Sequence, residues 1–293
     1  MEHVRVLRPA DGILAFYEGR EHGHRFAPGP NWVDEGALSL GIASYAIVDG
    51  AEALVYDTHV SVDRARFIRE TVDALGVERI TVLLSHWHLD HVAGTEAFAD
   101  CEVIACARTA EHLAERQDAI EAGTDGGSPA IDPLIMPTRT FTDRLELTVG
   151  EVKVEAIHLN IHSDDAVVLW LPERRLLLAG DTLEDTVTYV DEPEAFGAHL
   201  IGLIRLLDLG PERILPNHGS PERIASGGYD AGLIEATQAY IRRLQSCVHE
   251  PALRDEGLRD FVADSLAAGW IEYFEPYEEV HRNNVAAVLA AAG

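Results

Sequence analysis

The stretch "LLSHWHLDHVAG", residues 83–94, places three histidines and one aspartate within six positions, directly after an apolar run: His86, His88, Asp90 and His91. His86 and His88 are two positions apart, so on an extended segment both imidazoles point to the same side. Imidazole nitrogens and carboxylate oxygens are ligands that Zn²⁺ accepts in proteins. A metal site therefore explains the cluster better than an ordinary core or surface role does.

The residues on either side of this stretch predict alternating strands and helices. The pattern indicates strands at 44–50 and 52–58 with a turn at Asp49–Gly50, a helix at 61–76, a buried strand at 79–85, a strand at 102–106 and a helix from 108 to about 122. The histidine cluster then lies in the loop after the third of these strands. Residues 123–133, rich in Gly, Ser and Pro, are the candidate lid over a site.

The second half of the chain predicts a second set of strands. These lie near 145–149, 152–158, 166–171, 175–179 and 213–216, with a helix near 194–209, and from Tyr229 onward the pattern is helical in roughly three segments. Strand-rich halves flanked by helices indicate sheets that pack on each other under an outer cover of helices. We expect one catalytic domain over residues 1–228 and a helical C-terminal extension over 229–293 packed on it.

The charge balance restricts the partners. The chain has 50 acidic and 23 basic residues, a formal net charge of −27, and Lys153 is its only lysine. Such a surface repels phosphate backbones and anionic membranes, which argues against a nucleic-acid or membrane partner and favours a small-molecule substrate. High internal salt and a GC-rich genome both fit this composition, and the oligomeric state stays open.

The cysteines and the N-terminus indicate the compartment. Cys101, Cys106 and Cys247 form neither an even set nor a C-x-x-C pair, so reduced thiols are expected. The first residues lack a signal-peptide pattern, and no segment reaches 18 uninterrupted apolar residues. We therefore expect a cytoplasmic protein.

Four further short motifs, one before the histidine cluster and three after it, also contain a histidine or an aspartate next to a predicted strand. They are Asp57 in "VYDT", His162 in "NIHSDD", Asp181 in "LLLAGDT" and His218 in "LPNHGS". Together with H-x-H-x-D-H, this ordered set resembles the metallo-β-lactamase superfamily of hydrolases. The resemblance implies an α/β fold, the αββα four-layer sandwich, here with a helical C-terminal extension.

The resemblance also implies a dinuclear centre. One metal would be held by His86, His88 and His162, the other by Asp90, His91 and His218, and Asp181 would bridge them. Two Zn²⁺ ions are expected, with Fe or Mn as alternatives. Asp57 would orient a ligand, and the candidates for further outer partners of the histidines are Ser85, Thr58 and Thr182.

The chain departs from the family pattern in two places. Ile161 stands where the family usually has glycine before the third histidine, and His158 is a rival for that ligand. We favour His162, because Ser163 follows it and the distance to Asp181 leaves room for two strands. The second departure is His59, which stands after Asp57-Thr58 where the family has glycine, and it is left out of the metal set.

The resemblance implies hydrolysis of a small ester, lactone, thioester or amide by a metal-bound hydroxide, with Asp90 managing the proton. The alternatives are a mononuclear iron enzyme like the persulfide dioxygenases and a glyoxalase II-like thioesterase, which would use arginines of the C-terminal region. Glu184 stands where acyl-homoserine lactonases of the superfamily have a nearby tyrosine. The aromatic segment 270–284 is expected to pack as a helix rather than to contact substrate.

Overall fold

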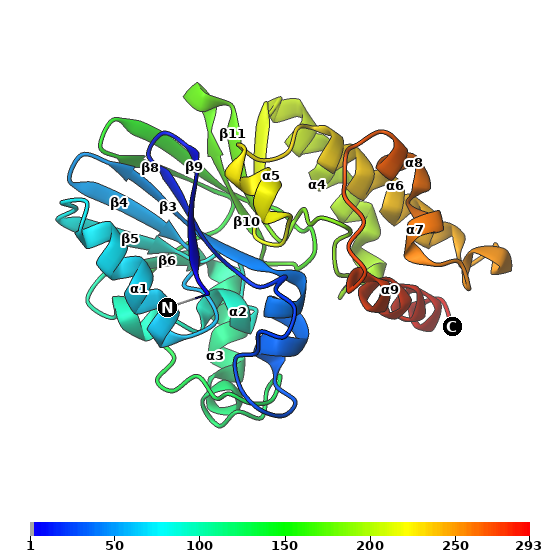
Figure 1. Ribbon diagram of the computed structural model, residues 1–293, viewed down its shortest axis with the longest axis horizontal. Helices are drawn as coiled ribbons and strands as arrows, with labels where there is room; N and C mark the ends of the chain where they lie inside the picture. The colour runs from blue at the N-terminus through cyan, green and yellow to red at the C-terminus, as the bar shows by residue number, and fades with distance from the viewer. Residues whose placement is uncertain (1–2) are drawn as a thin grey trace.

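Two β-sheets form the centre of the molecule. The computed structural model describes residues 3–293, and Figure 1 shows the sheets stacked in the left half of the view with helices on their outer sides. The first sheet has seven strands in chain order: β1 (Arg5–Ala10), β2 (Ile13–Glu18), β3 (Ile42–Asp49), β4 (Glu52–Tyr56), β5 (Arg79–Leu83), β6 (Glu102–Cys106) and β7 (Arg139–Phe141). Its first four strands are antiparallel, and β4 to β7 run parallel.

The second sheet has five strands in the order β12-β11-β10-β9-β8. They are β8 (Arg144–Val149), β9 (Val152–His158), β10 (Val167–Leu171), β11 (Leu176–Gly180) and β12 (Arg213–Pro216). Only β11 and β12 are parallel neighbours, and the other pairs are antiparallel. The strands β9, β11 and β12 therefore all end at the same edge of this sheet.

The helices cover the outer faces. Three helices connect strands of the first sheet: α1 (Val62–Asp73) after β4, α2 (Leu89–Val92) after β5 and α3 (Ala107–Glu121) after β6. The second half adds α4 (Phe196–Leu209), α5 (Pro221–Ala225), α6 (Gly232–Ser246), α7 (Leu258–Phe261), α8 (Ala263–Ala267) and α9 (Tyr277–Ala291). A π-helical turn, η1, spans Val33–Leu38, and shorter 3₁₀ turns are η2 (Thr95–Phe98), η3 (Pro172–Arg174), η4 (Pro193–Ala195) and η5 (Pro251–Leu253). No helix within residues 3–293 is both long and apolar enough to span a bilayer.

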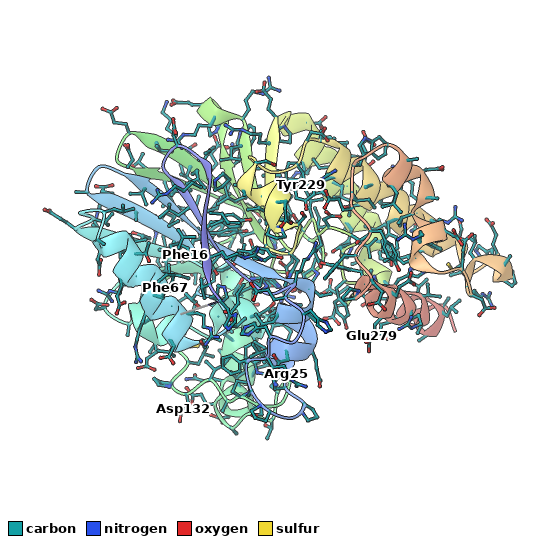
Figure 2. The ribbon with its side chains drawn as sticks, viewed as in Figure 1. Phe16, Arg25, Phe67, Asp132, Tyr229 and Glu279 are labelled. Carbon is teal, nitrogen blue, oxygen red and sulfur yellow. The ribbon has the colours of Figure 1, made fainter. Side chains whose placement is uncertain are left out.

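Strand alternation produces three separate layers of core. Along β2, Ala15 points into the core between the sheets, whereas Phe16 points to the outer core under α1 and α3. Along β11, Leu178 points between the sheets and Leu177 points to the outer core under α4, α6 and α9. Figure 2 labels Phe16 beside Phe67 of α1, and their rings meet edge to face at 6.4 Å. The predicted αββα four-layer sandwich is confirmed.

Part of the first sheet was not predicted from the sequence. The hairpin β1–β2 precedes the first expected strand, and all six residues of β2 are buried. A strand buried on both faces shows no alternation of apolar and polar residues, so its period is hidden in the sequence. The prediction also lacked η1, β7, α2 and α5, each six residues or shorter.

The C-terminal segments pack on the second sheet. Tyr229 forms an isolated bridge with Ile214 of β12, and α6 and α9 share one apolar core with α4. Of the three helical segments expected after Tyr229, α6 and α9 are the long ones, and α7 and α8 lie between them. Figure 1 shows these helices at the right of the view, beside the sandwich.

Candidate metal centre

The seven predicted ligands lie after the carboxyl ends of four strands. His86 and His88 follow β5, His162 follows β9, Asp181 follows β11, and His218 follows β12. Asp90 and His91 lie in the single turn α2, and the ring centroid of His91 lies 4.2 Å from that of His86. Strand ends from both sheets therefore meet at one edge of the sandwich.

The side chains form two groups that share one carboxylate. In the first group, His162 Nε2 lies 3.2 Å from His88 Nδ1, and ligand-type nitrogens of His86, His88 and His162 all lie within 4.8 Å of one another. In the second group, Asp90 Oδ1 lies 3.4 Å from His91 Nε2, and Asp90 Oδ2 lies 3.3 Å from His218 Nε2.

Asp181 lies between the two groups. Its Oδ2 atom is 3.0 Å from His91 Nε2 and 3.4 Å from His218 Nε2. The same atom is 3.7 Å from His86 Nε2 and 3.8 Å from His162 Nε2. This position is the one that a carboxylate bridging two cations would need.

Unpaired atoms at the centre test whether a metal fits. His86 Nε2 and Asp181 Oδ1 are buried and have no hydrogen-bond partner within residues 3–293. A buried polar atom without a partner is costly and rare in folded proteins. Five imidazoles and two carboxylates form a ligand set that suits a divalent transition metal, so the residues present fit the group that the sequence implies.

The structure separates the two rival histidines. His162 lies within the first group, whereas His158 Nε2 lies 2.8 Å from the backbone oxygen of Asp164, outside both groups. His162 has a φ of 70°, in the left-handed region that non-glycine residues rarely adopt. The unusual backbone therefore falls on the histidine itself and not on Ile161, the position where the family usually has glycine.

Outer contacts fix the orientation of the rings. Asp57 Oδ2 accepts from His91 Nδ1 at 2.9 Å and from Asn217 Nδ2 at 2.5 Å. Ser85 Oγ lies 2.9 Å from His86 Nδ1. Thr58 and Thr182, the other two expected partners, donate instead to backbone carbonyls of His91 and Ala179.

Three outer contacts have no counterpart in the sequence prediction. Asn217 Nδ2 lies 3.1 Å from His91 Nδ1, and its place directly before His218 was the only signal for it. His218 Nδ1 donates to the carbonyl of Gly41 at 2.7 Å, and His162 Nδ1 donates to the carbonyl of Tyr189 at 3.3 Å. Every residue type has a backbone carbonyl, so the sequence does not indicate the contacts of Gly41 and Tyr189. The two carbonyl contacts hold the rings of His218 and His162 in the tautomer that leaves Nε2 free for a metal.

Electrostatics differ between the two groups. Burial and neighbouring histidines lower the pKa of His86 well below its usual value, and burial lowers the pKa of His88 and of His162 to about 4. Burial also disfavours the charged form of His91 and His218, but the carboxylates of Asp181 and Asp90 outweigh it and raise the pKa of both. The first group is therefore already in the neutral form that binds metals, whereas the second must release protons first.

Two nearby side chains lie outside the metal groups. His59 is fully buried with a φ of 65°, burial lowers its pKa to about 4, and its Nδ1 accepts from the backbone of Val60. Trp87 lies inside the histidine stretch but packs against α3, because the guanidinium of Arg116 stacks 4.3 Å from its ring centroid. His59 belongs to neither group of ligand-type residues, and Trp87 packs against the outer core.

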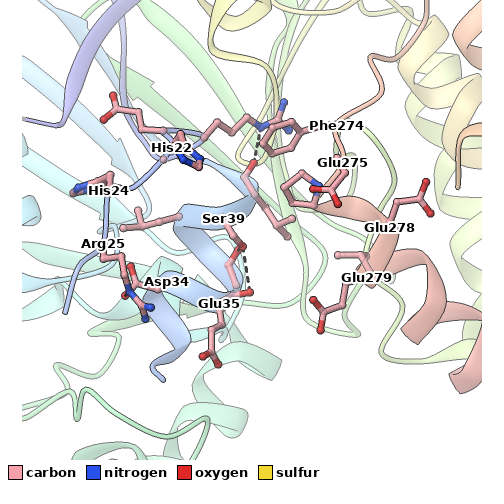
Figure 3. A pocket seen from close by; sticks show the side chains of 18 of the residues that line it. His22, His24, Arg25, Asp34, Glu35, Ser39, Phe274, Glu275, Glu278 and Glu279 are labelled. Atoms are coloured by element: carbon pink, nitrogen blue, oxygen red, sulfur yellow. Dashed lines mark hydrogen bonds and ion pairs between the residues drawn. The ribbon is translucent and has the colours of Figure 1, made fainter. Parts of the chain in front are cut away.

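A cavity of about 1060 Å³ lies next to the centre. One side, the N-terminal wall, consists of lining residues between Gly19 and Leu40, and the other, the C-terminal wall, consists of Tyr189 and residues between Phe274 and Asn283. Figure 3 shows Arg25, Asp34 and Glu35 on the first wall facing Glu278 and Glu279 on the second.

The two walls and the metal centre are connected. Arg20 donates to the backbone oxygens of Leu40 and Asp185 and stacks 4.3 Å from the ring centroid of Phe274, so it joins the walls. The lining includes none of the predicted ligands. The cavity meets the centre through Tyr189, whose carbonyl contacts His162, and through the chain between Leu40 and Gly41, whose carbonyl contacts His218.

The candidate lid lies elsewhere. In the segment 123–133, the backbone oxygens of Ser128 and Pro129 accept hydrogen bonds from Trp32, and Gly126 lies beside Leu89 of the histidine stretch. It does not line the cavity described above. Access over this segment stays a prediction.

This chain is similar to known proteins in sequence and in fold. The family described as "Metallo-beta-lactamase superfamily" matches residues 39–218. A beta-lactamase-like protein 2 homolog of Drosophila melanogaster is 29% identical over 228 residues, which cover 73% of this chain and 71% of that one. An atrochrysone carboxyl ACP thioesterase of Claviceps purpurea is 26% identical over 57% of this chain and 47% of its own length.

The fold comparison extends further along the chain. A crystal structure of a metallo-beta-lactamase family protein from Thermus thermophilus aligns with 97% of this chain and 92% of its own, with a TM-score of 0.62 and 20% identity. The family match covers more than half of the 293 residues and ends at His218, the last predicted ligand. The chain therefore belongs to the metallo-β-lactamase superfamily of metal-dependent hydrolases.

Proposed function

We propose that the chain is a dinuclear hydrolase of a small ester, lactone, thioester or amide. The observation that carries this proposal is the position of Asp181 Oδ2, within 3.8 Å of one Nε2 atom from each of four histidines that belong to both groups. When two metals are bound, they supply an activated water and stabilise negative charge on the substrate oxygen.

Asp90 is the proposed proton acceptor. Burial would raise the pKa of this carboxyl, but His91 and His218 outweigh it and lower the pKa to about 2. The group is therefore ionised at neutral pH. Its side chain keeps 17% of its surface exposed, more than the 5% of Asp181, so it can meet a water or a substrate atom.

The charges around the centre favour a substrate that is not a polyanion. The cavity lining contains six carboxylates (Glu21, Asp34, Glu35, Glu275, Glu278, Glu279) and three guanidinium groups (Arg20, Arg25, Arg282). The whole chain has a net charge of −27. A phosphodiester chain would be repelled by both, whereas a small acyl compound would not.

Among these acyl compounds, a thioester is also supported by the name of a relative of this chain. The thioesterase from Claviceps purpurea is among the relatives of this chain. A glyoxalase II-like use of the C-terminal arginines has less support, because Arg243 pairs with Glu256, Arg254 donates to backbone carbonyls and Arg259 stacks on Tyr273.

The test compares two histidines four residues apart. We expect two metals per wild-type chain by elemental analysis and turnover in a screen of lactones, thioesters, β-lactams and phosphodiesters. His162→Ala should lose one metal and most of the turnover, and His158→Ala should retain both, because His158 lies outside the two groups. A wild-type chain that reproducibly holds one iron and no second metal would instead support the mononuclear dioxygenase-like alternative.

A further inference from the structure

The segment after Asp181 contacts two of the predicted ligands. Thr188 Oγ1 donates to the backbone oxygen of Asp181 at 3.3 Å, and the carbonyl of Tyr189 accepts from His162 Nδ1 at 3.3 Å. The backbone N–H of Tyr189 donates to Glu184 Oε1 at 2.9 Å. The Tyr189 carbonyl is the hydrogen-bond partner of His162 Nδ1, and Glu184 Oε1 lies 3.8 Å from the same nitrogen.

A residue far along the chain holds both neighbours of Tyr189. Asn284 lies on α9 and is fully buried. Its Oδ1 accepts from the backbone N–H of Val190 at 2.9 Å, and its Nδ2 donates to the carbonyl of Thr188 at 2.9 Å and to Tyr240 Oη at 3.0 Å. One amide group thus fixes the peptides on either side of Tyr189.

The helix around Asn284 is otherwise built for packing. The buried residues of α9 are Tyr277, Val280, His281, Asn284, Val285 and Val288, which form one stripe at helical spacing. A buried amide in such a stripe is unfavourable unless its hydrogen bonds are made. Asn284 makes them all with the segment next to the metal centre or with Tyr240, so packing alone does not account for this residue.

We propose that Asn284 is a positioning residue for the metal centre: it fixes the Thr188–Val190 backbone so that the Tyr189 carbonyl holds His162 with Nε2 directed at the metal. The inference rests on the proposed function only in that His162 is a ligand. Loss of the amide would leave the N–H of Val190 and the carbonyl of Thr188 without partners, and the segment would relax. The ring of His162 would then lose its fixed tautomer and orientation.

The experiment measures metal affinity rather than turnover. Metal-free full-length chain is titrated with Zn²⁺ in competition with a chromophoric chelator. Asn284→Leu should bind one of its two metals, the one held by His162, about tenfold less tightly, at the low end of the effect of losing an outer contact. Val288→Ala is the matched control, because Val288 is also buried on α9, one turn further on. It should lower the melting temperature without changing either affinity.

A double-mutant cycle assigns the effect to His162. In a His162→Ala background, Asn284→Leu should cause no further loss of affinity, because the ring that it positions is gone. Equal losses in Asn284→Leu and Val288→Ala, or an undiminished loss in the His162→Ala background, would overturn the inference. If Asn284→Leu fails to fold, Asn284→Asp enters the same cycle, since it keeps the acceptor for Val190 and lacks the donor to Thr188.

The outcomes also separate the inference from the proposed function. Wild-type chain that binds two metals, with an unaffected Asn284→Leu, would overturn the inference alone. Wild-type chain that binds fewer than two metals would overturn the dinuclear hydrolase. It would overturn the positioning role only if His162→Ala left the bound metal in place.

Discussion

The two walls of the cavity are anchored by buried carboxylates in opposite ways. At the start of the N-terminal wall, Glu18 accepts two hydrogen bonds from Arg64, at 2.9 and 3.0 Å, and lies 2.8 Å from His24 Nε2. At the C-terminal wall, Asp185 accepts from the hydroxyl of Tyr229 at 2.7 Å and from the backbone N–H of Glu272 at 2.8 Å. The first anchor is an ion pair, and the second uses uncharged donors.

This difference reverses the effect of burial on the two carboxyl groups. Burial alone would raise the pKa of Glu18, but Arg64 outweighs it and lowers the pKa to about 2. Burial dominates at Asp185 and raises its pKa to about 6. The two buried carboxylates, one at each wall, therefore respond to pH with opposite sign, and the charge of the partner decides which sign applies.

The largest expected effect comes from removing the ionic anchor. The folded pKa of Glu18, about 2, lies below its usual 4.5, so its contribution is present above pH 4.5 and is lost as the pH falls toward 2. Glu18→Gln should lower the free energy of unfolding at pH 7 by roughly 3 kcal/mol and abolish that acid dependence. Urea denaturation between pH 2 and 7 measures both.

Glu21→Gln is the control for this substitution. Glu21 pairs with His3 at 3.0 Å, but both side chains are at least a third exposed, so the change should cost less than about 1 kcal/mol. Equal losses in the two variants would mean that the buried pair is not the anchor.

A smaller effect of opposite sign is expected at the other wall. The folded pKa of Asp185, about 6, lies above its usual 3.8, so its contribution is present below pH 3.8 and is lost as the pH rises through 6. Asp185→Asn should raise the free energy of unfolding at pH 7 by roughly 2 kcal/mol and flatten the profile between pH 4 and 6. Asp191→Asn, at an exposed site, is the control, and an unchanged slope in Asp185→Asn would refute the contrast.

Salt should produce the smallest effect, and it should act equally on both walls. Raising KCl from 0.1 to 1 M screens repulsion within a surface of net charge −27 and should stabilise the chain by roughly 1 kcal/mol, about 2–4 °C in melting temperature. Buried anchors are screened much less, so wild type, Glu18→Gln and Asp185→Asn should shift together. A flat melting temperature would remove the high-salt explanation of the acidic composition and leave the GC-rich one.

The sequence predicted which ligand-type side chains lie together, because each of them stands in a short motif after an apolar strand. The runs before Asp181 and His218 became β11 and β12. His162 was separated from His158 by the following serine and by spacing, and the structure brings only His162 to the other ligand-type residues.

Some contacts that orient these ligand-type side chains could not be predicted, because no local sequence motif marks the residues that make them. Asn284 reaches its partners only because α9 packs across the second half of the sandwich, and no local pattern connects it to Thr188. Gly41 and Tyr189 act through backbone carbonyls, which every residue type has. Within its stripe Asn284 differs from the valines in being polar, as His281 also does, and the aromatic segment around it was expected to serve packing alone.

The meeting of strand ends from both sheets has a consequence for how the protein matures. The predicted ligands converge from positions between 86 and 218, so no early fragment of a growing chain contains a complete site. Closing loops of this length is slow compared with forming local structure, which makes the centre a late product of folding. An ion that binds only the finished fold then stabilises it by mass action. The folded fraction of this protein is thereby linked to the free metal concentration that its chains meet after synthesis.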